Sequence, residues 1–93
     1  MLYYRYIKKH KEMNSMKYKT QGTCSQEIEI ELKDGVIESV KFTGGCNGNL
    51  QGIGALVKGM TPEEVITRCK GIRCGFKPTS CPDQLARALE SML

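Results

Sequence analysis

The chain of 93 residues has no tryptophan, two phenylalanines (Phe42 and Phe76) and one histidine. A domain this small with so little aromatic mass is often stabilised by a metal, a disulfide or a second subunit. No stretch approaches the ~20 apolar residues of a membrane span, and residues 1–10 contain no apolar run of secretory length. We therefore expect a small cytoplasmic domain without membrane attachment.

Several catalytic patterns are also missing. The sequence contains no P-loop, no serine–histidine–aspartate set and no paired carboxylate site, so we predict no catalytic residues. The single histidine, His10, lies in a basic segment and is expected to be solvated. Glu27, Glu29 and Glu31 alternate with apolar residues and are expected to form the solvated face of a strand.

The net charge of +4 is unevenly distributed. All the excess lies in residues 1–18, whereas residues 19–93 hold equal numbers of basic and acidic side chains. The basic tail alone is a weak indication of nucleic-acid binding, which we do not expect of the folded part. We interpret residues 1–15 as an N-terminal tail or start-site extension and residues 16–93 as a single domain.

The strongest strand signal is the alternation of Ile28, Ile30 and Leu32 with charged residues. The following Asp34-Gly35 pair favours a two-residue turn, because both positions accept positive φ. This predicts a hairpin over about 26–43. Ile37 and Val40 are three residues apart, so a bulge between them is needed for both to face the core.

Three helices are expected, over about 48–58, 62–70 and 81–92. Thr61 with Glu64, and Ser80 with Asp83, have the spacing of capping boxes, and prolines follow both caps. In the first helix, Gly52 and Gly54 are best explained by a segment that packs close to the backbone.

The predicted fold class is α+β: a small antiparallel sheet covered on one face by about three helices. A hairpin alone is marginally stable, so we expect a third strand from 17–24 or a second subunit.

The five cysteines are an odd number in a chain without export signals, which favours reduced thiols. Four of them lie at the ends of predicted elements, where side chains can converge: Cys24, Cys46, Cys74 and Cys81. Cys46 and Cys81 each adjoin a helix start, where the helix dipole favours thiolate. Cys69 lies inside a helix and is interpreted as a structural core residue.

These four thiols predict a tetrathiolate site for Zn²⁺ or an iron–sulfur cluster. Their spacing is long and irregular, unlike a paired C-x2-C framework. Two alternatives stay open: buried inert thiols, or a redox dithiol formed by Cys74 and Cys81.

Residues 16–93 resemble the stand-alone TSCPD-domain family, named for the residues that stand here at Thr79 to Asp83. The motifs GTCS at 22–25, FTGGCNGNL at 42–50 and GIRCG at 71–75 support the resemblance, although the family usually has proline where Asn47 stands. The resemblance implies that the family's cysteines are Cys24, Cys46, Cys74 and Cys81. It also implies a link to ribonucleotide reductase, because related domains occur at the C-terminus of the B12-dependent enzymes.

The same region resembles the U-type iron–sulfur scaffold proteins more distantly. The similarity rests on Cys24 before the hairpin, Gly45-Cys46 after it and Cys81 at the start of the last helix. Those scaffolds have an aspartate two residues after the first cysteine, where this chain has Gln26. Cys74 is an additional thiol that favours a closed four-sulfur site.

We therefore expect a four-cysteine, zinc-binding accessory or interaction domain linked to ribonucleotide reductase, with a protein partner or a homodimer. The alternatives are an iron–sulfur scaffold or carrier, and a dithiol protein that supplies electrons through Cys74 and Cys81. The chain is too short for the substrate barrel and radical site of ribonucleoside-diphosphate reductase itself, so an autonomous enzyme is not expected.

Overall fold

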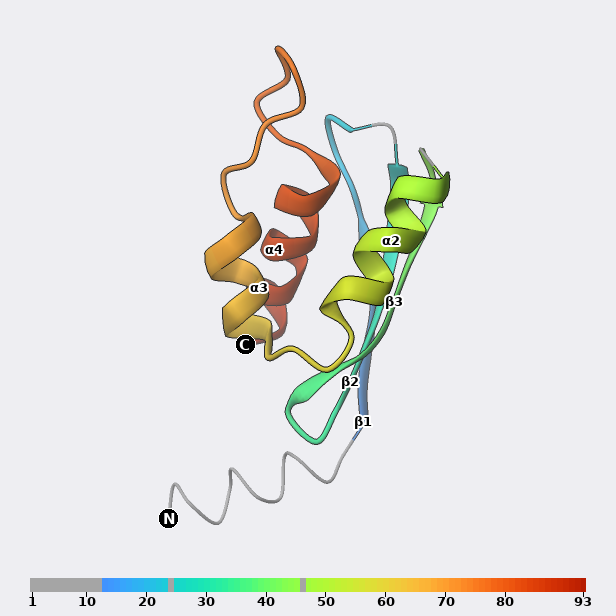
Figure 1. The fold of residues 1–93 in the computed structure, drawn as a ribbon, viewed down its shortest axis with the longest axis vertical. Coiled ribbons are helices and arrows are strands. Elements are labelled where there is room, and N and C mark those ends of the chain that lie inside the picture. Colours follow the sequence, from blue (N-terminus) through green and yellow to red (C-terminus); the bar gives the residue numbers. More distant parts are fainter. Residues whose placement is uncertain (1–12, 24, 46) are drawn as a thin grey trace.

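The computed structural model describes residues 13–23, 25–45 and 47–93. Its elements follow the order of three strands and three helices (Figure 1): β1 (Met13–Lys19), β2 (Ser25–Lys33), β3 (Val36–Gly44), α2 (Asn47–Val57), α3 (Pro62–Cys69) and α4 (Cys81–Met92). The strands form one antiparallel sheet in the order β1-β2-β3. The predicted α+β class is therefore confirmed.

The hairpin forms where the sequence predicts it. β2 and β3 are joined by Asp34 and Gly35, both with positive φ (56° and 80°). The third strand is present but lies at Met13–Lys19, earlier than the predicted 17–24. It pairs along β2, with Met16 opposite Ile30.

The predicted bulge is confirmed. Leu32 pairs with Ile37, while the preceding residue of β2 pairs with Ser39, so Glu38 has no partner across the strands. This extra residue shifts the alternation by one position, and Ile37 and Val40 are both buried. Because of the bulge, Ile37 and Val40 both face the core although they are three residues apart.

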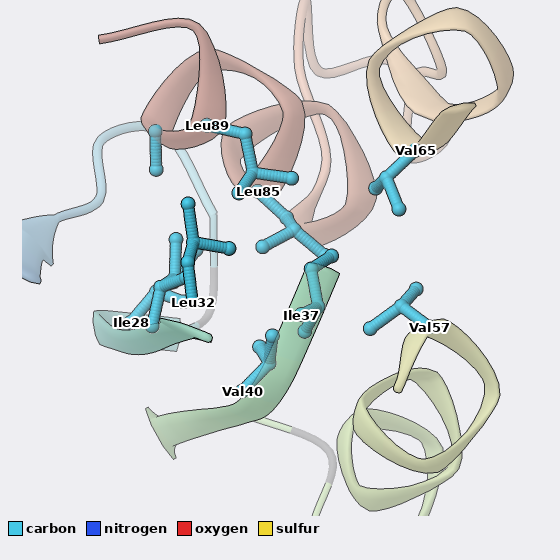
Figure 2. Close-up of a cluster of buried hydrophobic side chains, with 10 residues drawn as sticks. Ile28, Leu32, Ile37, Val40, Val57, Val65, Leu85 and Leu89 are labelled. Atoms are coloured by element: carbon cyan, nitrogen blue, oxygen red, sulfur yellow. The ribbon is translucent and has the colours of Figure 1, made fainter. Parts of the chain in front are cut away.

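The core lies between the sheet and the helices (Figure 2). α2 packs on β3, α4 contacts β2, and α3 packs on α4. Apolar side chains from both layers meet there: Ile28, Ile30, Leu32, Ile37, Val40, Val57, Val65, Leu85, Ala88 and Leu89. On the other face, Glu29 is exposed between Lys17 and Lys41 of the neighbouring strands, as expected for a solvated face.

α3 begins directly after its predicted N-cap, Thr61. Thr61 and Glu64 form the predicted capping box, with Thr61 N donating to Glu64 Oε1 at 3.0 Å and Glu64 N donating to Thr61 Oγ1 at 3.2 Å. The backbone hydrogen bond from Thr61 lowers the pKa of Glu64, and the Thr61 side chain adds to this effect. In the described part of the chain, no helix has the length and hydrophobicity that a bilayer span requires.

Two glycines of α2 should respond to alanine in opposite directions. A Cβ on Gly54 would lie 2.7 Å from the Val40 carbonyl oxygen, whereas a Cβ on Gly52 would meet nothing within 4 Å. We expect Gly54→Ala to destabilise the protein by about 1–3 kcal/mol, and Gly52→Ala to stabilise it by up to about 1 kcal/mol. Urea unfolding of both variants measures this. Equal effects would contradict the close approach of α2 to β3.

Close packing on the backbone thus explains Gly54 but not Gly52. The second part of that expectation was wrong, because Gly52 faces open space.

Candidate functional site

The site is centred on the N-terminus of α4. Ser80 is the N-cap, and its Oγ accepts a hydrogen bond from Asp83 N at 3.1 Å. Cys81 is the first residue of the helix and is buried. The predicted capping box is only half present, because the Asp83 carboxylate binds other groups instead of returning to the cap.

The side chain of Asp83 is fully buried and accepts three hydrogen bonds. The donors are Gly71 N at 2.6 Å, the Thr79 hydroxyl, and Arg87 Nε at 2.9 Å. Burial alone would raise the pKa of Asp83. The hydrogen bonds from Thr79, Gly71 and Arg87 outweigh it, so the pKa lies below its ordinary value. Asp83 is therefore a buried anion that fixes the surrounding backbone.

The segment that carries Cys74, residues 70–80, is bound near its beginning to the start of α4 and to the N-cap Ser80. Gly71 N donates to Asp83, and Ser80 Oγ donates to the Ile72 carbonyl oxygen at 2.7 Å. Within the segment, Cys74 N donates to the Thr79 carbonyl oxygen at 3.1 Å. These bonds hold an exposed thiol next to the start of α4.

Gln84 connects the loop before β2 to the start of α4. Its Nε2 donates to Thr79 Oγ1 at 2.9 Å, and its Oε1 accepts from Gln21 N at 3.2 Å. A Cβ on Gly22 would lie 3.1 Å from Thr79 Cγ2, so the two loops are also in close contact. The buried Gln84 side chain thereby joins the loop before β2 to the segment before α4.

The first residue of β2 reaches the thiol itself. Ser25 Oγ lies 3.2 Å from Cys81 Sγ, and both residues are buried. Thr23 Oγ1 lies 3.1 Å from the same serine oxygen. The start of β2 and the start of α4 therefore meet at Cys81, although 56 residues separate Ser25 from Cys81.

A groove of about 550 Å³ opens between α2 and the start of α4; we call it the α2–α4 groove. Both Cys74 and Cys81 line it. The other described lining residues are mainly small or apolar: Gly48, Asn49, Leu50, Gly52, Ile53, Leu56, Ser80 and Pro82. None of them is a carboxylate or a histidine, so the thiols are the strongest metal ligands in this lining.

The structure brings together two of the four predicted ligands, Cys74 and Cys81. The other two, Cys24 and Cys46, lie outside the described residues. Their described neighbours lie at the site, since Ser25 contacts Cys81 and Gly48 lines the groove. Among the described residues alone, no group of three or more potential metal ligands is present.

Cys69 is placed differently. It is the last residue of α3, half-buried and packed against the core. Burial raises the pKa of the Cys69 thiol, opposed by the charge of Arg68. This position in the core agrees with a structural role for Cys69. That Cys69 is not a metal ligand stays a prediction.

Sequence reasoning did not identify Ser25 and Gln84 as parts of the site, and it assigned Asp83 only to a cap. The sequence carried no signal for the burial of Asp83. Helical spacing places Asp83 on the side of Arg87 and away from Leu85, and in the structure Gly71 N and the Thr79 hydroxyl of the segment before α4 donate to it there.

A family model of the TSCPD domain matches residues 3–93 of the chain. Neither the curated proteins nor the solved structures contain a significant match.

Proposed function

Since the chain belongs to the TSCPD-domain family, we propose that it is an accessory domain that binds Zn²⁺ through Cys24, Cys46, Cys74 and Cys81. The zinc ion would join four chain segments without contributing redox chemistry of its own. The proposed role is support of ribonucleotide reduction, by analogy with the related domains of B12-dependent reductases. A protein partner or a second copy of the chain would use the domain as a binding module.

The observation that carries the proposal is the shared location of Cys74 and Cys81. Both thiols line one groove, and α2, which follows position 46 in the sequence, forms its opposite wall. Ser25, which follows position 24, lies 3.2 Å from Cys81 Sγ. This arrangement supports convergence of four sulfurs, a donor set that suits Zn²⁺ and disfavours hard cations.

The hydrogen bonds of Thr79, Ser80 and Asp83 support the same proposal. They fix the segment that carries Cys74 against the helix that starts with Cys81. Ligands held in place before the metal arrives lose less conformational entropy when they bind it. In the TSCPD motif we therefore assign ligation to the cysteine, and its positioning to the threonine, serine and aspartate.

The second candidate is a redox dithiol. It is favoured by one observation, that Cys74 is exposed beside Cys81 in the same groove. Two electrons and two protons would leave the thiols as a disulfide forms, and a reductase would be the electron acceptor. An iron–sulfur scaffold is a third reading, supported by the order of three strands and three helices and weakened by Gln26.

Anaerobic purification followed by metal analysis and a visible spectrum tests the three readings. Zinc near one ion per chain, without visible absorption, supports the proposal. Sulfur-to-iron charge-transfer absorption would overturn it in favour of a cluster protein. Absence of metal, together with two thiols that oxidise reversibly, would overturn it in favour of the dithiol.

A further inference from the structure

The α2–α4 groove is apolar and open. Leu56 is 79% exposed although it lines the groove, and Ile53 and Pro82 continue the apolar lining. The segment that supplies Cys74 also carries two exposed apolar side chains, Ile72 and the fully exposed Phe76. Exposed large apolar residues that gather around a groove are typical of an interaction site.

The described lining of the groove holds no charged residue, and the charges of the adjoining segment, Arg73 and Lys77, lie on either side of Cys74, which lines it. α2 contains no charged residue, and the sequence has no acidic residue between Glu64 and Asp83. The ion pairs of the described residues are Lys70–Glu90 and Arg87–Asp83, so the exposed Arg73 and Lys77 have no acidic partner there. The segment beside the groove therefore presents uncompensated positive charge.

We propose that the α2–α4 groove binds a segment of another protein in which apolar residues are flanked by acidic ones. The apolar side chains would occupy the groove beside Leu56, and the acidic residues would pair with Arg73 and Lys77. Such charge complementarity selects the partner and speeds association. The inference rests on the accessory role proposed above, but it does not require bound metal.

Two other occupants fit less well. In a symmetric dimer both sides of the interface would be this same surface, and neither α2 nor residues 65–82 supply an acidic residue to pair with Arg73 and Lys77. A nucleic acid would need more cations than this segment offers, and stacking platforms are built from aromatic side chains, of which the described lining has none and the segment only Phe76.

A peptide selection tests the proposal. Random twelve-residue peptides would be selected on the full chain, and the enriched peptides synthesised and titrated by calorimetry. We expect enrichment of leucine or aromatic residues next to aspartate or glutamate. Leu56→Asp should weaken binding about tenfold or more. Arg73→Glu/Lys77→Glu should weaken it about tenfold and reduce its dependence on salt.

Matched controls separate the groove from general surface effects. Leu93→Asp changes another leucine that is 61% exposed, outside the groove, and should leave affinity unchanged. Lys33→Glu/Arg68→Glu makes the same change in net charge at exposed positions of β2 and α3, outside the segment that supplies Cys74, and should also have little effect. A circular-dichroism spectrum of each variant verifies folding.

Four binding results would overturn the inference. These are no enriched peptide, enriched peptides without acidic residues, controls that lose binding as much as the groove variants, or tighter binding of a single-stranded oligonucleotide. A dimer in sedimentation that Leu56→Asp dissociates would instead assign the groove to a second copy. Zinc content is measured on the same samples. Bound zinc without peptide binding rejects this inference alone, and peptide binding without zinc rejects only the metal assignment.

Discussion

Replacing Asp83 with alanine is expected to destabilise the protein by about 3 kcal/mol, because buried donors lose their shared acceptor. The carboxylate accepts from Gly71 N, the Thr79 hydroxyl and Arg87 Nε, and it is fully buried. A domain of this size has a free energy of unfolding near the low end of the usual range of about 5–15 kcal/mol. The variant should therefore lose a large share of its stability in urea unfolding.

The lowered pKa of Asp83 also predicts how stability depends on pH. In the unfolded chain the carboxyl titrates near its ordinary value of about 3.9. In the folded protein the pKa is lower, so the folded state favours the charged form. The contribution is complete above the unfolded pKa and is lost as the pH falls below about 4 through the folded pKa. Asp83→Asn should remove this acid-dependent part of the stability curve.

Glu90→Gln is the control for these measurements. Glu90 forms an ion pair with Lys70 at 2.8 Å, but both side chains are substantially exposed. Such pairs contribute about 0–1 kcal/mol, so little change is expected. If Asp83→Ala were as mild as Glu90→Gln, the proposed role of Asp83 in fixing residues 70–80 would be wrong.

Cys81→Ser and Cys74→Ser are each expected to reduce zinc affinity more than about 100-fold, the upper end of what second-sphere changes cost. Serine keeps the size of the side chain but removes a thiolate, the ligand that a soft metal prefers. Zinc bound per chain after dialysis against a competing chelator measures the effect. Removing zinc from the unmodified protein should also lower its unfolding temperature, because binding energy in a structural site is folding energy.

Cys69→Ala is the matched control. Cys69 is half-buried at the end of α3 and packs against the core, so alanine should cost some stability and leave zinc content unchanged. Loss of zinc in this variant would contradict the four-ligand assignment. Full zinc content in Cys74→Ser would contradict it too, and would favour a role for Cys74 outside metal binding.

Local patterns in the sequence predicted most of the fold. Each of these patterns involves only a few neighbouring residues, so the element it predicts can be recognised in the sequence. They are the alternation around Ile28 and Ile30, the turn at Asp34-Gly35, and the caps at Thr61 and Ser80. The third strand was misplaced because β1 has mixed polarity, and its pairing with β2 determines its extent.

Periodicity, turn chemistry and capping are local, so the fold class, the helix starts and the candidate thiols can be predicted from the residues alone. Three contacts appear only in the folded chain: Ser25 lies against Cys81, Gln84 joins two loops, and Asp83 accepts from Gly71 and Thr79. These contacts join residues brought together by the packing of α4 on the sheet. A buried polar group must find a partner, but its sequence position does not say which one.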